Sequence, residues 1–238
     1  MDSSQTDLQQ IGLVGRMLRV FYAPGEAFEA LSRGHSKADW LVPAVLVALV
    51  TVVTTHQVMP IAMKAGTAAM QEQLGEMPAE QREMMEKMQS VSQTAGLISA
   101  PIMTFVALFI SGALLLLLAR MLGGEATYGQ MLPVFAYGSL IGVVKSLVIT
   151  PLMVSKQSVM VQTGLGLLMS DELLQTFFGR FVSMLELFTV WQAAVTAIGL
   201  SIVAGVSMGK AFTGIFALLL IVVAIAAALA GLSSAFGG

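Results

Sequence analysis

Five long apolar stretches, separated by polar segments, dominate the pattern of this 238-residue chain. They cover residues Trp40–Met59, Leu97–Ala119, Met131–Val154, Phe181–Ser207 and Ala211–Ala230. A helix rises about 1.5 Å per residue, so about 20 apolar residues cross a hydrocarbon core about 30 Å thick. No water is available there to bond the backbone, and a helix satisfies its own N–H and C=O groups. The pattern therefore predicts an all-α polytopic membrane protein with five transmembrane helices.

The first 39 residues carry an amphipathic pattern. Apolar residues recur at helical spacing from Leu8 to Phe21, and Pro24 suits the first turn of a second short helix. In that second helix, the apolar Phe28 and Leu31 lie on one side, and the acidic Glu26 and Glu29 lie on the other. We expect residues 1–39 to form interfacial amphipathic helices that brace the bundle, after a disordered start over residues 1–6. The alternative is that this segment docks a partner or anionic lipid.

The transmembrane domain is expected to cover residues 40–233, with a Met-rich extramembrane helical segment at 60–96. Pro60 is expected to end the first span, and Gly75 with Pro78 to divide the segment into two helices. Methionines recur there every seven residues, at Met63, Met70, Met77 and Met84. Thioethers bind copper(I), but this stripe contains no histidine or cysteine. The composition therefore favours an adaptable apolar face over a copper site.

Residues 155–180 form a second, partly apolar connection, which we interpret as interfacial or re-entrant, with a helix starting near Ser170–Asp171. Five spans place the two termini on opposite sides of the membrane. Six Lys and Arg residues flank the spans on the N-terminal side and five on the other, and this difference does not decide the orientation by the positive-inside rule. We take the N-terminus as cytoplasmic and the location as the cell inner (plasma) membrane, multi-pass.

Three ionisable side chains lie well inside the predicted spans: His56, Lys145 and Glu186. Such residues usually face the bundle and pair, because a charge at the bilayer centre costs at least about 2.5–3.5 kcal/mol. The alternating span directions bring all three toward one leaflet, where Gln57 and Gln192 add hydrogen-bonding groups. One interpretation is a structural clasp that fixes helix register. The other is a cavity open to one leaflet that binds a proton, an ion or a lipid head group.

Composition narrows the functional classes. The formal net charge of −2 supplies no basic field for nucleic acid, so no nucleic-acid partner is expected. The sequence has no cysteine and two histidines, which disfavours thiolate and histidine-rich metal sites. It also lacks a His-Glu-x-x-His motif, a Gly-x-Ser-x-Gly motif and a P-loop. We therefore expect no enzyme activity, no catalytic residues, no cofactor and no metal.

Several segments, taken in order, resemble a known family. The last two spans contain Glu186-Leu-Phe-Thr-Val-Trp191, then Ala197-Ile-Gly199-Leu, then Ser207-Met-Gly-Lys210-Ala-Phe212. Nearer the start lie Phe21-Tyr-Ala-Pro24 to Phe28, then Trp40 and Pro43, and then Pro133-Val-Phe-Ala-Tyr137-Gly138. Over roughly residues 15–225 the chain resembles the Yip family, the Ypt/Rab-GTPase-interacting integral membrane proteins, in its bacterial branch.

The resemblance implies five transmembrane helices and a cytoplasmic N-terminus. Eukaryotic members are implicated in vesicle traffic and membrane shaping, but this chain lacks the Asp-Leu-Tyr-Gly-Pro motif and has a short N-terminal region. We therefore predict a membrane-organising protein that interacts with lipids, a partner membrane protein or a second copy of itself. The alternative is a transporter, channel or lipid-moving protein that uses the polar residues around Lys145 and Glu186.

Overall fold

The computed structural model describes residues 11–74, 79–159, 161 and 164–236. Its residues gather in two compact units, and each is described by itself. The first unit contains Met1–Pro43, Leu108–Gly142 and Gln162–Gly238. The second contains Ala44–Ala107 and Val143–Val161. Three long helices therefore contribute one end to each unit.

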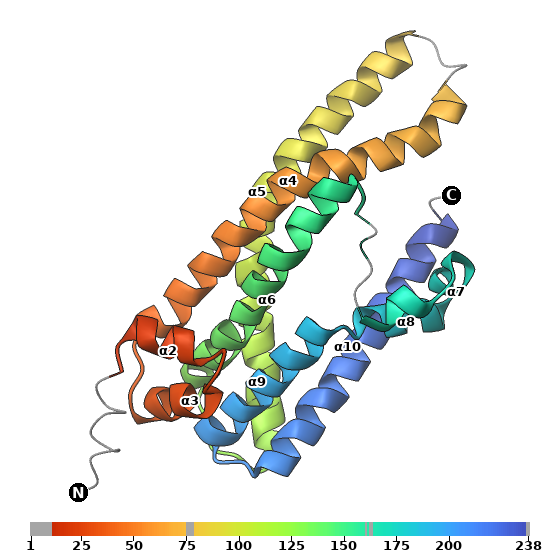
Figure 1. The fold of residues 1–238 in the computed structure, drawn as a ribbon. Helices are drawn as coiled ribbons and strands as arrows, with labels where there is room; N and C mark the ends of the chain where they lie inside the picture. Colours follow the sequence, from red (N-terminus) through yellow and green to blue (C-terminus); the bar gives the residue numbers. More distant parts are fainter. Residues whose placement is uncertain (1–10, 75–78, 160, 162–163, 237–238) are drawn as a thin grey trace, which may run out of the picture. The chain divides into compact units, whose positions relative to one another are not determined.

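Helices account for nearly all regular structure in the described residues, which contain no strand (Figure 1). The two short N-terminal helices are α2 (Leu13–Arg19) and α3 (Pro24–Arg33). The long helices are α4 (Ala38–Leu74), α5 (Ala79–Met121), α6 (Tyr128–Lys156), α9 (Leu187–Ala204) and α10 (Met208–Phe236). Between α6 and α9 lie a 3-10 turn, η1 (Gly164–Leu168), and two short helices, α7 (Asp171–Gln175) and α8 (Phe177–Met184).

Five of these helices are long and apolar enough to cross a membrane, as the sequence predicts. The candidate spans are Ala38–Lys64, Ser90–Met121, Tyr128–Lys156, Leu187–Ala204 and Met208–Leu232. Each contains an apolar window of at least 18 residues. That length is close to what a hydrocarbon core about 30 Å thick requires.

Two predicted span boundaries are wrong. Pro60 does not end the first span, because α4 continues through it to Leu74. Proline removes one helical hydrogen bond, here the one to the His56 carbonyl four residues earlier, and such a helix often bends without ending. Figure 1 shows α4 bending along its length. The fourth span begins at Leu187, not Phe181, because the helix breaks between Met184 and Leu187.

The predicted division at Gly75 and Pro78 is partly visible. One helix ends at Leu74 and the next begins at Ala79, whereas residues 75–78 lie outside the described part. Both helices are continuous with spans. In the stripe of methionines, Met84 is exposed, whereas Met70 and Met77 lie among side chains that are not described. The predicted disorder of residues 1–6 also lies outside the described residues.

The core of the first unit joins the N-terminal helices to the spans. In α3, which begins at Pro24 as predicted, Phe28 and Leu31 are buried, whereas Glu26 and Glu29 are exposed. A Cβ added to Gly199 of α9 would lie 2.7 Å from the Phe28 ring, so the glycine allows this close approach. Phe21 packs edge-on against Trp191 of α9, with ring centroids 6.3 Å apart. We call Leu13–Arg33 the collar, because it packs on the side of the helix bundle.

The α9–α10 turn depends on a glycine conformation. Gly205 ends α9 with φ of 68°, in the left-handed region that glycine adopts without steric cost. Val206 donates its N–H to the Ser201 carbonyl at 3.1 Å, and Ser201 Oγ donates to the Val206 carbonyl at 2.7 Å. The turn therefore satisfies its backbone locally and lets α10 start three residues later, at Met208.

In the second unit, α4 and the end of α6 run in the same direction (Figure 1). Thr150 Oγ1 of α6 lies 3.4 Å from Thr54 Oγ1 of α4, which sets the register between the two helices. Gly96 of α5 gives space to Met59, whose Cε would lie 2.7 Å from an added Cβ.

The predicted helix near Ser170–Asp171 is confirmed as α7 in the first unit. Ser170 is its N-cap, and Ser170 Oγ accepts a hydrogen bond from the Leu173 N–H at 3.3 Å. Thr176 caps α8 in the same way, accepting from the Gly179 N–H at 3.1 Å.

Candidate functional site

A buried polar cluster ties the collar to the first span. Asp39, the second residue of α4, is 1% exposed, and its Oδ1 lies 2.8 Å from Arg16 Nη2 of α2. Tyr137 of α6 donates its hydroxyl to the same oxygen at 3.3 Å. We call Arg16, Asp39 and Tyr137 the collar anchor. It joins three elements that are far apart in the sequence.

Local structure positions the Asp39 carboxylate. Ser36 donates its N–H to Asp39 Oδ2 at 2.8 Å, and its hydroxyl lies 3.2 Å from the same oxygen. A serine followed three residues later by an acid, with the acid accepting from the serine N–H, is the geometry of a capping box. The carboxylate oxygens therefore have charged and neutral donors on both sides, as a buried charge requires.

Arg16 is also positioned by the backbone. Its Nη1 donates to the Gly34 carbonyl at 3.3 Å, beyond the end of α3. A second ion pair closes the collar, because Arg19 Nε lies 2.9 Å from Glu26 Oε2. The first pair is buried and the second is half-exposed, so removing one partner of the first pair costs more stability than removing one partner of the second.

Sequence reasoning missed the collar anchor. Asp39 stands one residue before the predicted first span, and Arg16 lies in the predicted interfacial segment that precedes it. The signal that could have found Asp39 is Ser36-x-x-Asp39 directly before an apolar run, which is a capping-box pattern. Nothing in the sequence spacing identifies Arg16 or Tyr137 as its partners.

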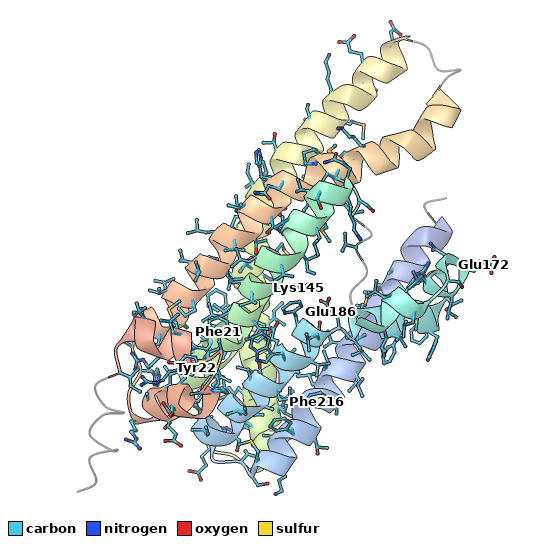
Figure 2. The ribbon with its side chains drawn as sticks, in the orientation of Figure 1. Phe21, Tyr22, Lys145, Glu172, Glu186 and Phe216 are labelled. Carbon is cyan, nitrogen blue, oxygen red and sulfur yellow. The ribbon has the colours of Figure 1, made fainter. Side chains whose placement is uncertain are left out.

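The outward side of the collar is apolar. Val14, Leu18 and Tyr22 follow each other at four-residue spacing and are 66%, 55% and 73% exposed. On the inward side, Met17, Val20 and Phe21 pack in the core of the first unit. We call Val14, Leu18 and Tyr22 the outer stripe. Figure 2 shows Phe21 and Tyr22 in this part of the chain.

Glu186 lies at the break between α8 and α9 (Figure 2). Glu186 is 6% exposed and occupies the N-cap position of α9. Its side chain makes no cap hydrogen bond. Gly164 packs closely here, because an added Cβ would lie 3.3 Å from the Glu186 Cα. The predicted carboxylate is therefore buried, but it marks the start of the span and does not lie inside it.

The other predicted polar residues separate into different surroundings. His56 and Gln57 are exposed on α4 in the second unit, and Lys145 is half-buried on α6 in the same unit. The Thr54–Thr150 contact offsets His56 from Lys145 by seven residues along parallel helices, or roughly 10 Å. Glu186 and Gln192 belong to the first unit. The predicted polar residues therefore belong to two units: His56, Gln57 and Lys145 to the second, and Glu186 and Gln192 to the first.

Gln192 lines a cavity inside the first unit. The cavity has a volume of about 290 Å³ and lies among α5, α6, α9 and α10. Its polar lining comes from Ser111, Thr189, Gln192 and Thr196. Its apolar lining consists of Leu114, Leu115, Phe135, Ala193, Ile215, Leu218, Leu219 and Val222. Leu114 and Val222 are also exposed, so the cavity reaches the outer surface of the helices.

The collar anchor and the cavity differ in the chemical groups that they present. In the described ranges, no three His, Asp or Glu side chains gather as metal ligands would. The collar anchor uses its charged groups on one another, and the cavity lining contains no ionisable residue. The arrangement offers apolar contact surface with a few hydrogen-bonding groups, which is typical of a small-molecule or lipid site.

Comparison with known proteins identifies the family. The Yip1 domain matches residues 18–230, which is most of the chain and covers four candidate spans completely and the fifth up to residue 230. No curated protein and no solved structure gives a significant match. The match includes Asp39 and Tyr137 of the collar anchor and every residue that lines the cavity. The chain belongs to the Yip1 domain family of multi-pass membrane proteins.

Proposed function

We propose that this protein organises the membrane without catalysis, by holding the outer stripe of its collar against the lipid surface. The observation that carries this proposal is the pairing of an exposed apolar stripe with a buried attachment to the first span. Asp39 is the second residue of that span, so Arg16 holds the collar at one membrane boundary. An apolar helix face at that level inserts favourably among lipid head groups.

Aromatic residues support this placement. Trp40 stands at the start of the first span and contacts Phe109, with ring centroids 5.9 Å apart. Tyr128 begins the third span and donates its hydroxyl to the Phe109 carbonyl at 3.0 Å. Trp and Tyr are enriched where hydrocarbon meets water, and Trp40 and Tyr128 stand among the first residues of their candidate spans. In our proposal the membrane is the bacterial inner membrane and the collar lies on its cytoplasmic side.

Reconstitution into vesicles tests the proposal. The purified protein should narrow or tubulate vesicles, measured as vesicle diameter by cryo-electron microscopy. Replacing the outer stripe through Val14→Ser, Leu18→Ser and Tyr22→Ser together should remove the effect, while the spans still insert. A matched control carries Ser32→Ala and His35→Ala, which change exposed residues in or next to the collar outside the stripe. Equal vesicle shapes with all three proteins would overturn the proposal.

A second candidate function is transport or lipid movement. It is supported by the break between α8 and α9 with a buried carboxylate at the start of α9. Discontinuous helices with polar groups at the break form substrate sites in many transporters. The residues of this candidate site in the first unit are Glu186 and Gln192. Liposome flux and lipid-scrambling assays that compare the natural protein with Glu186→Gln test it. Activity lost in the variant supports transport, and no activity in either protein counts against it.

A further inference from the structure

The cavity beside Gln192 has an unusual position for an apolar hollow. Its lining residues on α9 and α10 lie seven or more residues, or at least roughly 10 Å, from the α9–α10 turn. Its rim reaches the outer surface at Leu114 and Val222. The medium at that rim is hydrocarbon, because both residues lie within candidate spans.

An apolar hollow of this size favours an occupant. Its 290 Å³ is about twice the 150 Å³ of an engineered dry cavity that binds benzene. Empty space forfeits the dispersion contacts of every atom that lines it. Water is a poor occupant of the apolar part, where it finds few hydrogen-bond partners. Lipid chains are the available apolar material beside an opening between transmembrane helices.

The polar groups of the cavity indicate which end of a lipid they meet. Thr189 lies in the first turn of α9, and Gln192 lies one turn deeper. In the described part of the chain, the side-chain amide of Gln192 has no protein hydrogen-bond partner; its main-chain carbonyl accepts from Thr196 Oγ1 at 2.8 Å. An amide N–H and a hydroxyl near one end of a span match the ester oxygens at the top of an acyl chain.

We propose that this cavity binds one acyl chain of a membrane phospholipid, with Thr189 and Gln192 hydrogen-bonded to its ester group. The chain enters past Val222 and Leu114 and packs against Leu115, Phe135 and Ile215. The lipid comes from the leaflet nearest Glu186, because Thr189 lies three residues from that end of α9. This inference goes beyond the proposed function and does not depend on the collar.

Photocrosslinking in vesicles tests the proposal. The probe is a phosphatidylethanolamine with a diazirine in one acyl chain, and crosslinked residues are mapped by mass spectrometry. The expected result is crosslinking concentrated on cavity residues, including Phe135 and Ile215. The variant Leu218→Trp fills the cavity and should reduce this crosslinking by about tenfold. Its matched control is Leu220→Trp, on the same helix but exposed and outside the lining, which should leave the crosslinking unchanged.

Two further experiments test whether the cavity binds the ester group of a phospholipid. The variant Gln192→Leu keeps the side-chain volume but removes the amide. A hydrogen bond within a membrane contributes about 0.6 kcal/mol on average, so crosslinking should fall about threefold. A diazirine fatty acid without glycerol replaces the phospholipid in a parallel experiment and should label the cavity more weakly. Labelling spread evenly over the outer helix faces and unaffected by Leu218→Trp would overturn the proposal. Labelling of the cavity by the free fatty acid alone would also overturn it.

Discussion

Polar side chains near the start of α4 and near its middle have opposite environments. Near its start, Asp39 is buried and receives donors from Arg16, Tyr137 and Ser36. Farther along, within the second unit, His56 and Gln57 are exposed. Both groups belong to the same candidate span, so position along a hydrophobic stretch does not determine which polar residues become buried. The helix face and the neighbouring elements determine it.

The largest expected effect comes from removing the anion of the collar anchor. Asp39→Ala leaves the Arg16 guanidinium, 16% exposed, without its carboxylate, and removes the acceptor for Tyr137 and Ser36. Breaking a buried ion pair on one side typically costs about 3–5 kcal/mol. The free energy of unfolding in mild detergent, measured by denaturant titration, should fall by that amount. Glu29→Ala, which removes an exposed acid 4.0 Å from Arg33, is the control and should change it by less than about 0.5 kcal/mol. Equal losses from the two variants would contradict the anchor.

The next effect comes from packing beneath the collar. In Gly199→Ala the new Cβ would lie 2.7 Å from the Phe28 ring and 2.9 Å from Val134. Overpacking of this kind typically costs about 1–3 kcal/mol, so the same titration should show a loss in that range. Gly142→Ala is the matched variant, because Gly142 also lies inside a helix but has nothing within 4 Å of an added Cβ. That variant should be neutral or stabilise by up to about 1 kcal/mol. A neutral Gly199→Ala would show that α3 does not sit tightly on α9.

A smaller effect is expected at the third member of the anchor. Tyr137→Phe keeps the ring against Phe28 and removes the hydroxyl that donates to Asp39 at 3.3 Å. One hydrogen bond of this kind contributes about 0.5–1.5 kcal/mol. Its loss should be non-additive with Asp39→Ala, because both variants remove the same contact. A double-mutant cycle measures the coupling, and strict additivity would argue against a shared network.

The smallest effects are expected at the exposed residues of the second unit. His56→Ala and Gln57→Ala change residues on the surface of α4, and such substitutions usually alter stability by no more than about 0.5 kcal/mol. A decrease of more than about 2 kcal/mol in the free energy of unfolding of either variant would show that these side chains make stabilising contacts like those of Asp39. Comparison with Asp39→Ala in the same detergent removes the effect of the medium.

The elements that follow from hydropathy could be predicted from sequence. Five apolar stretches gave five spanning helices, Pro24 gave the start of α3, and Ser170 gave the start of α7. Each depends on residues close together in the chain. The continuation of α4 through Pro60 could not be predicted, because a proline either ends or bends a helix depending on what packs around it.

The candidate sites were less predictable because they depend on contacts between distant segments. Arg16, Asp39 and Tyr137 come from segments that are separated by as many as 121 positions in the sequence. The sequence points to Gln192 because its polar side chain lies within a span, but four helices form its cavity, and no local pattern relates them. The proposed clasp of His56, Lys145 and Glu186 stays a prediction.

The position of the outer stripe is the most direct test of the whole account. The sequence contains no cysteine, so Leu18→Cys provides a unique attachment site for a spin label in vesicle-reconstituted protein. We predict that electron paramagnetic resonance will find this label accessible to oxygen and shielded from a water-soluble nickel reagent, whereas a label at Glu29→Cys will be open to nickel. A label at position 18 that meets nickel as often as the label at position 29 would contradict the claim that the collar holds its apolar stripe in the membrane surface.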